Sequence, residues 1–359
     1  MNPRRFERPS LGRSLPVFCR TLLTAAAIAS CVAWSGEHAA TAMGASARAG
    51  DQPSLELVQT IDLKGKSGGL DHVALDAGRQ RLFVANKVNN TMDVVDLKAG
   101  KLHQQIRGQQ GIQGISYAPD LDRIYVGLGG QGLFNIFDAK TYRPLKTIKF
   151  ADDSDNVRYD PRTHLVYVAH AETSLGVVDA KALALKTDIK LPGEAEGFQI
   201  EKDRPRMYVC IPSPCKIAVI DTEKNEIAGA YPIQLASGAT AVALDEPNHR
   251  VFVACRKEPL LVVLDSETGK EVTSVPIAAD VDDLFFDAQR KRLYASCGEG
   301  YLVVIKQKDA DNYEAVEKIP TAKGAKTSLF VPETGRLYLA VPRQEGKPGP
   351  EIRIYQAKP

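Results

Sequence analysis

Polar side chains recur along this sequence at steps of about 42 residues, and several of them could bind a cation. The members of this series are Asp71, Gln113, Asp155, Glu196, Thr240, Asp282 and Lys326. Carboxylates gathered round one opening could hold Ca²⁺, which takes six to eight oxygen ligands. Together with His72, the residues Asp71, Asp155 and Asp282 could instead bind a transition metal. The sequence has no compact metal motif, so we expect no cofactor, with Ca²⁺ or a transition metal as the alternative.

The position that follows this series adds groups that could bind a ligand or transfer a proton. Its members are His72, Gly114, Asn156, Gly197, Ala241, Asp283 and Thr327. A general acid–base pair could form between His72 or His170 and Asp282 or Asp283, if the fold brings them together. The sequence has no G-x-S-x-G motif and no recognisable Ser/His/acid set, so it gives no support for nucleophilic hydrolysis. The residues expected at a binding site are Asp71, His72, Asp155, Asn156, Arg158, His170, Glu196, Asp282, Asp283 and Lys326.

Arg158 is the only charged residue at its position of the repeat. The residues at the equivalent positions are Ala74, Ser116, Gln199, Ala243, Phe285 and Leu329. An arginine on an innermost strand needs carboxylate partners or an anionic ligand, because an unpaired buried charge is costly. We expect an internal salt bridge, for which Asp155 or Asp71 could supply the carboxylate, and an anion is the alternative. The polar series itself could also surround a water-filled channel that binds nothing.

The elements that must position these residues form a unit that occurs seven times. Each unit has an apolar–polar strand, a turn, a second strand that usually starts with Arg, a polar loop and a third strand that often ends in Asp. The second strands are Arg81–Ala85, Arg123–Gly127, Leu165–Ala169, Arg206–Cys210, Arg250–Ala254, Arg292–Ser296 and Arg336–Ala340. A repeat of this length with four strand signals predicts an all-β, seven-bladed β-propeller with four-stranded blades.

The last unit lacks a fourth strand, and the start of the repeat region can supply it. Its strands are predicted at about Thr327–Val331, Arg336–Val341 and Glu351–Tyr355. The segment Leu55–Leu63 resembles the fourth strands of other units, such as Pro144–Phe150. Pairing this N-terminal strand into the last blade would close the ring and remove an open sheet edge.

Turn chemistry predicts which loops share a face of the propeller. The first and third turns of each unit are short and rich in Gly, Pro and Asp, as in Asp76–Gly78 and Lys98–Gly100. The loops between the second and third strands, and those that join one blade to the next, must therefore lie on the opposite face. We expect a functional site there, round the mouth of the channel, because rigid blades carry variable loops.

Composition and charge agree with one propeller and argue against a polyanionic partner. Hydrophobic residues make up 44% of the chain and charged residues 25%, and no Pro/Ser/Gly linker interrupts the units. The first 42 residues hold five Arg and two Glu, which leaves 41 basic and 42 acidic residues in the rest. A nearly neutral chain does not predict a basic surface that would bind nucleic acid. We expect a monomer with an envelope protein or a small molecule as its partner.

The first 42 residues have the pattern of an export signal. A basic segment from Arg4 to Arg20 precedes the apolar run Leu22–Trp34, which is too short to span a bilayer. Ala40–Ala42 offers an A-x-A cleavage site, whereas Ile28–Cys31 resembles a lipobox that would place a lipid on Cys31. We expect a signal peptide at 1–42, a linker at 43–53 and the propeller at 54–359. The location would be periplasmic or extracellular, with a lipid anchor at Cys31 as the alternative and no transmembrane span.

Four cysteines remain after the leader. Cys210 and Cys215 flank a Pro-rich turn, where they could face each other across a hairpin. A disulfide between them is therefore plausible in an oxidising compartment. Cys255 and Cys297 occupy equivalent places in adjacent units, and equivalent places on neighbouring blades are usually too far apart for a bridge. We expect those two to be small buried residues.

The units resemble the YVTN-type (YncE-like) β-propeller repeats of exported bacterial and archaeal proteins. The resemblance covers about Leu55 to the C-terminus and rests on an apolar-aromatic-Val-Ala strand followed by a Val-rich strand that ends in Asp. Matching pairs are Phe83–Asn86 with Asp93–Asp96, Tyr167–His170 with Val177–Asp179, and Phe252–Cys255 with Val262–Asp265. The resemblance implies the propeller fold and an export route, and a binding role more loosely.

Function is less constrained than fold, because propellers carry unrelated activities. We expect a binding or scaffold module that contacts a protein or a small ligand at the acidic channel mouth. Related propellers include lactonases and lyases with a metal in the channel mouth. The alternative is therefore a metal-assisted lactonase- or lyase-like enzyme that uses the same mouth.

Overall fold

The computed structural model describes residues 53–66 and 68–359, and every structural statement below concerns these residues. The predicted signal peptide at 1–42, with Cys31, lies outside them, as does all but the last residue of the predicted linker at 43–53. No helix in the described part of the chain is long and apolar enough to cross a membrane.

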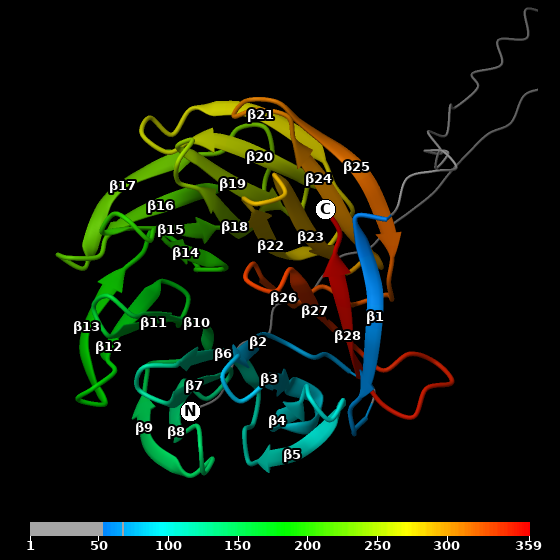
Figure 1. The fold of residues 1–359 in the computed structure, drawn as a ribbon. Coiled ribbons are helices and arrows are strands. Elements are labelled where there is room, and N and C mark those ends of the chain that lie inside the picture. Colours follow the sequence, from blue (N-terminus) through cyan, green and yellow to red (C-terminus); the bar gives the residue numbers. More distant parts are fainter. Residues whose placement is uncertain (1–52, 67) are drawn as a thin grey trace, which may run out of the picture. The chain divides into compact units, whose positions relative to one another are not determined.

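Seven antiparallel sheets of four strands each stand round a common axis (Figure 1). Blade 1 consists of β2 (Val73–Asp76), β3 (Arg81–Asn86), β4 (Thr91–Asp96) and β5 (Lys101–Arg107). Blade 2 consists of β6 (Ile112–Ala118), β7 (Arg123–Leu128), β8 (Leu133–Asp138) and β9 (Pro144–Lys149). Blade 3 consists of β10 (Ser154–Asp160), β11 (Leu165–His170), β12 (Ser174–Asp179) and β13 (Ala184–Lys190). A short 3-10 helix, Lys87–Asn89, joins β3 to β4.

The second half of the ring continues the same order. Blade 4 consists of β14 (Phe198–Ile200), β15 (Arg206–Ile211), β16 (Lys216–Asp221) and β17 (Glu226–Pro232). Blade 5 consists of β18 (Ala239–Asp245), β19 (Arg250–Cys255), β20 (Leu260–Asp265) and β21 (Glu271–Pro276). Blade 6 consists of β22 (Val281–Asp287), β23 (Arg292–Cys297), β24 (Tyr301–Gln307) and β25 (Tyr313–Pro320). The seven-bladed, four-stranded fold predicted from the repeat is confirmed.

Blade 7 closes the ring in the way that the sequence predicts. It consists of β26 (Ser328–Val331), β27 (Arg336–Val341), β28 (Glu351–Ala357) and the N-terminal strand β1 (Leu55–Asp62). In Figure 1 the blue β1 lies beside the red β28. The pairing runs antiparallel from Leu55 opposite Ala357 to Asp62 opposite Glu351, with one bulge at Leu57/Gln59. Residues about 300 positions apart in sequence therefore share one sheet.

The Arg and Asp that mark each unit stabilise neighbouring parts of the blade. In blades 1, 2, 4 and 5 the Arg that begins the second strand lies opposite the Asp that ends the third, as Arg250 does with Asp265. The Arg250 guanidinium lies 3.1 Å from the Asp265 carboxylate, which also accepts a hydrogen bond from the Thr268 amide at 2.8 Å. Hydrogen bonds from the Thr268 hydroxyl and from the turn amides lower the pKa of Asp265, since they stabilise its charged form.

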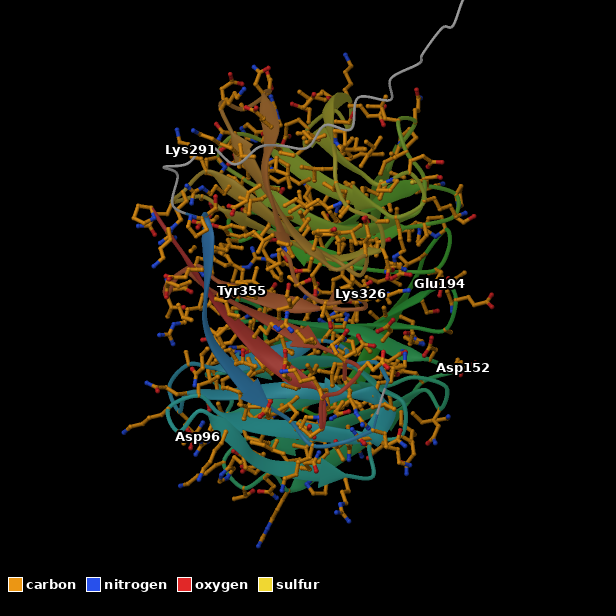
Figure 2. All side chains as sticks on the ribbon, turned by 90° about the vertical axis from the view of Figure 1, so that its right-hand side faces the viewer. Asp96, Asp152, Glu194, Lys291, Lys326 and Tyr355 are labelled. Atoms are coloured by element: carbon orange, nitrogen blue, oxygen red, sulfur yellow. The ribbon has the colours of Figure 1, made fainter. Side chains whose placement is uncertain are left out.

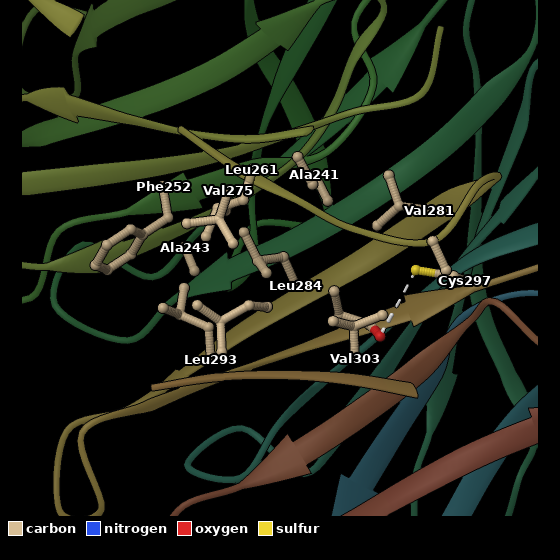
Figure 3. Packing of buried hydrophobic residues seen from close by; sticks show 14 of the residues in the cluster. Ala241, Ala243, Phe252, Leu261, Val275, Val281, Leu284, Leu293, Cys297 and Val303 are labelled. Atoms are coloured by element: carbon tan, nitrogen blue, oxygen red, sulfur yellow. Dashed lines mark hydrogen bonds between the residues drawn. The ribbon is translucent and has the colours of Figure 1, made fainter. Parts of the chain in front are cut away.

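The hydrophobic core lies between the blades. Figure 3 shows the packing of blade 5 against blade 6, where Phe252 and Ala243 meet Leu284 and Leu293. The second and third strands of each blade are buried along most of their length, because both of their faces are covered by neighbouring sheets. This packing makes the blades a rigid frame for the innermost strands.

The two faces of the propeller carry different connections. Asp96 and Lys291 lie next to third and first turns, and Asp152 and Glu194 lie in blade-to-blade connections. Figure 2 shows the first pair on one face and the second pair on the other. We call these the hairpin face and the loop face, and their separation is the one that the turn chemistry predicts.

The predicted Cys210–Cys215 disulfide is wrong in this structure, where all four cysteines of the described chain are free. The strand register places Cys210 opposite Ile217, so that Cys215 lies beyond the paired part of the hairpin. The Cys215 thiol interacts instead with Cys255 of the next blade, and this interaction lowers the pKa of Cys215 to about 7. Cys255 and Cys297 are buried, as expected.

Candidate functional site

The innermost strands of all seven blades surround a cavity of about 940 Å³ on the propeller axis. We call this cavity the chamber. Its walls contain apolar and polar side chains in comparable shares. The polar ones include Ser116, Gln199 and Asp287, and the apolar ones include Val73, Ile115, Val157, Phe198, Val242, Phe285 and Leu329. Exposed residues at the first turns of three blades also line the chamber, namely Lys202, Asp203, Gln289 and Glu333. The chamber therefore opens on the hairpin face.

The polar residues predicted from the repeat lie at the loop-face end of this chamber. His72, Asp282 and Asp283 line it there, next to apolar positions such as Leu284. The register of the inner strand shifts at this height in four blades, as between Val281 and Asp283. Such bulges re-aim side chains where regular strands would alternate them. Side chains at two consecutive positions can therefore both lie at the same end of the channel.

Three of the four predicted metal ligands come together. The ligand atoms of Asp71, His72 and Asp155 all lie within 4.8 Å of one another. Ligands of one divalent cation are separated by comparable distances, because each lies about 2–2.5 Å from the ion. Asp282 is not part of this group, since it forms an ion pair with Arg256.

Cations neutralise some carboxylates at this end of the channel but not others. Lys87 lies 3.7 Å from Asp71, and Lys326 lies 4.0 Å from Asp282. For Asp155 and Glu196, no cationic side chain lies within 4.0 Å in the described part of the chain. Burial raises the pKa of Asp155 well above its ordinary value and that of Glu196 to about 7. These two acids favour a proton or a bound cation.

The pKa values of His72 and Asp283, at the second polar position of the repeat, are also shifted. Burial lowers the pKa of His72 to about 4, and the positive charge of Arg158 adds to this effect, so the imidazole is neutral at pH 7. Burial raises the pKa of Asp283 to about 7, and the neighbouring Asp282 adds to that shift. The Asp283 carboxylate accepts a hydrogen bond of 2.7 Å from the Ser328 amide. A neutral imidazole has a free nitrogen lone pair, which is the form that binds metals.

These shifts predict that the metal-free protein is more stable at pH 6 than at pH 8. Glu196 and Asp283 have folded-state pKa values of about 7, above their unfolded values of about 4. Their contribution is complete below the unfolded pKa and is lost as the pH rises through 7. His72 opposes them only between about pH 4 and 6.5. We expect a loss of about 1–3 kcal/mol between pH 6 and pH 8.

Chemical unfolding in EDTA at both pH values measures this difference. Glu196→Gln combined with Asp283→Asn removes both titrating groups and should leave a much smaller dependence. The prediction is wrong if the wild-type protein is equally stable at both pH values, or if the double variant keeps the full difference.

Arg158 lies in the chamber wall without the salt bridge that we expected. No carboxylate in the described chain lies within 4.0 Å of its guanidinium, although Asp155 and Asp283 contribute favourable charge from farther away. The guanidinium donates one hydrogen bond, from Nη1 to the Val157 carbonyl at 3.0 Å, and its Cζ lies 5.7 Å from the centre of the Phe198 ring. Asp71 and Asp155 gather instead round His72, which leaves Arg158 facing the chamber.

The remaining predicted residues divide between the channel and other places. Asn156 is buried beside the acidic group, and its side-chain oxygen has no hydrogen-bond partner in the described structure. His170 lies on the second strand of blade 3, where its Nε2 is 2.7 Å from Asp188 on the outermost strand and its ring stacks on Phe150. The structure therefore does not bring His170 to the channel.

Two cations of the site were missed from the sequence, although the repeat held a signal for them. Lys87 and Arg256 both stand six residues after the Arg that begins their second strand. The other units have Gly129, Ala171, Pro212, Gly298 and Pro342 at this position. Residues just after a second strand lie on the loop face, so a long cation there can reach the carboxylates of the channel mouth.

Comparisons with known proteins support the fold and a family. No family model matches the chain. It is 22% identical over 298 residues to the uncharacterized protein YncE of Salmonella typhimurium, a match that covers 81% of this chain and 73% of that protein. The YncE of Salmonella typhi is 21% identical over the same shares.

Solved structures of other proteins contain a similar fold. A chain of Kuenenia stuttgartiensis hydrazine synthase superposes with a TM-score of 0.68 at 16% identity, covering 77% of this chain and 94% of that one. A chain of a mitotic checkpoint complex superposes with a TM-score of 0.71 at 13% identity, covering 85% and 92%. At such identities the likeness shows the fold alone. Because its sequence matches the YncE proteins over most of its length and it has the seven blades that the repeat predicts, this chain is a YncE-like β-propeller.

Proposed function

We propose that the protein is an exported binding module that holds a small ligand in the chamber on its propeller axis. The observation that carries this proposal is the chamber itself, with a volume of about 940 Å³ and a lining that combines apolar side chains with polar groups at both ends. Small-molecule sites in proteins typically have about 300–1,000 Å³ and combine apolar walls with placed polar groups, and the volume of the chamber lies in this range. Export is inferred from the leader pattern of residues 1–42, and the ligand would accordingly be met outside the cytoplasm.

The site proposed here differs in position from the acidic mouth considered from the sequence. The acidic residues lie at the loop-face end of the channel, and the chamber extends from there to the hairpin face. A ligand would therefore enter past Lys202 and Glu333 and would meet His72, Asp282 and Asp283 at the inner end. A scaffold that binds a protein through its outer loops would make no use of this volume.

A small-molecule screen that reads the unfolding temperature tests the proposal. A ligand at one hundred times its Kd stabilises the folded state by about 2.7 kcal/mol. Ser116→Phe fills part of the chamber with a side chain that the fold already accepts at the equivalent position, Phe285. We expect stabilising compounds to lose their effect in Ser116→Phe and to keep it in Ala182→Phe, a matched change at an exposed turn. Compounds that stabilise both variants equally would place binding outside the chamber.

One observation favours a second candidate, a metal-assisted lactonase- or lyase-like enzyme. Asp71, His72 and Asp155 offer a nitrogen and carboxylate oxygens within 4.8 Å of one another, and His72 also lines the chamber. A divalent cation held there would act as a Lewis acid on a ligand in the chamber. The ammonium group of Lys87, 3.7 Å from Asp71, competes with such a cation.

Metal content separates the two candidates. The protein is purified without chelators and analysed by elemental mass spectrometry, beside Asp71→Asn and the matched surface variant Asp203→Asn. A stoichiometric metal that is lost only in Asp71→Asn would favour the enzyme and direct assays to lactones and lyase substrates. A wild-type protein without metal would favour the binding module.

A further inference from the structure

We propose that the chamber ligand is a small organic anion with an apolar body, and that Arg158 binds its carboxylate. This inference rests on the proposed function above and names the class of ligand. It follows from an arginine that faces the chamber with most of its hydrogen-bonding capacity unused.

The hydrogen bonds of Arg158 leave its guanidinium available. A guanidinium has five N–H donors, and the only hydrogen bond of the Arg158 side chain in the described structure goes to the Val157 carbonyl. Several other arginines of the described chain are paired with carboxylates, whereas Arg123 and Arg292 bond only to backbone carbonyls. Arg79 binds Asp76 and Asp122, and Arg256 binds Asp282. Arg158 is the only arginine among the described residues that line the chamber, and a carboxylate could accept two parallel bonds from it.

The other titratable groups of the chamber do not neutralise Arg158 by contact. His72 is neutral near pH 7, and Asp282 is held by Arg256 and approached by Lys326. Asp283 is partly protonated at pH 7 and is bonded to the Ser328 amide. The rim residues Lys202, Asp203 and Glu333 are exposed to solvent, so their charges are screened. The inner chamber therefore offers one cation with no direct counterion.

The walls indicate what the rest of the ligand must be. Phe198 lies under the guanidinium, and Phe285 and Leu329 stand at the same repeat position as Arg158 in blades 6 and 7. A bare inorganic anion would leave most of the chamber and its apolar walls uncovered. An acid with an aromatic or branched aliphatic body would bury these walls while its carboxylate reaches Arg158.

Isothermal titration calorimetry with a matched pair of probes tests the inference. Phenylacetate and its neutral amide phenylacetamide have nearly the same shape and differ in charge. At pH 7 we expect the full chain to bind phenylacetate at least about tenfold more tightly, since a hydrogen bond between charged groups is stronger than one to a neutral amide. Arg158→Met should abolish this preference, Arg158→Lys should keep part of it, and the exposed Arg143→Met should leave it unchanged.

Two further variants test whether Arg158 serves ligand binding rather than the stability of the fold. If it is held for the ligand rather than for the fold, Arg158→Met should unfold at the same temperature as the wild type or higher. Asp283→Asn removes a competing negative charge and keeps an acceptor for the Ser328 amide, so it should bind phenylacetate more tightly at pH 8.

The outcomes distinguish failure of this inference from failure of the proposed function. Equal binding of both probes in the wild type, lost in Ser116→Phe, would overturn the anion inference and leave the chamber as a binding site. A preference for phenylacetate that survives in Arg158→Met would overturn the role of Arg158. If neither probe binds and the screen finds no compound sensitive to Ser116→Phe, both proposals are wrong.

Discussion

Removal of residues 54–63 should abolish cooperative folding of the whole propeller. This segment contains β1, the outermost strand of blade 7, and it buries Leu55, Ile61 and Leu63 against the neighbouring blades. Each such side chain contributes about 1.5–3 kcal/mol, so the loss amounts to about 5 kcal/mol or more. Natural domains have about 5–15 kcal/mol of stability in total. The deletion also exposes the hydrogen-bonding edge of β28, which invites aggregation.

Single substitutions in β1 test the same effect without opening the ring. Ile61 is 1% exposed, whereas Leu57 is 48% exposed. We expect Ile61→Ala to cost about 2–5 kcal/mol and Leu57→Ala to change stability by less than about 0.5 kcal/mol. Urea unfolding followed by circular dichroism measures both. Equal midpoints for the deletion and the intact protein, or for the two substitutions, would show that ring closure does not depend on β1.

Gly114→Ala should be the most damaging change of a single atom in the channel. A Cβ at this position would lie 1.6 Å from the Asp155 carbonyl oxygen and 2.7 Å from Cγ2 of Val157. These atoms belong to the inner strand of the next blade, so the strand must move to make room. Overpacking of this kind typically costs 1–3 kcal/mol, and the clash with backbone suggests about 3 kcal/mol or more. Because the movement displaces Asp155, it should also disrupt the Asp71–His72–Asp155 group.

Gly229→Ala is the matched control, since nothing lies within 4 Å of a Cβ added there. The unfolding free energies of the two variants, compared with that of the wild type, measure the effect. A Gly114→Ala protein as stable as Gly229→Ala would mean that blades 2 and 3 do not approach each other as closely as the structure shows.

The fold was predictable from the sequence because the same strand pattern occurs in all seven units, and each unit packs against its neighbours in the same way. A propeller blade must bury its second and third strands, so their apolar pattern recurs visibly, as in Arg81–Asn86 and Arg250–Cys255. Closure by β1 was predictable for a related reason: the last unit lacks a strand and the first segment has the pattern of one. Alignment of the seven units also predicted that Asp71 and Asp155 lie at the same level along the propeller axis.

Contacts between side chains were less predictable, because the period does not determine how far each one reaches. Arg158 was expected to meet Asp155 or Asp71, but both of these carboxylates group with His72. Lys87 and Arg256 reach the channel from loops, which a strand-based alignment treats as variable. The cysteine pairing failed for a different reason, since a shift of two residues in register separates Cys210 from Cys215. His170 pointed outward because its strand is the second of its blade.

A crystal structure of the full chain, grown with phenylacetate or the best compound of the screen at ten times its Kd, tests the central claim most directly. The account predicts electron density inside the chamber, with the acid group at the Arg158 guanidinium and the apolar body between Phe198 and Phe285. Density for the compound on the outer loops, or a chamber that holds only water at that concentration, would contradict it.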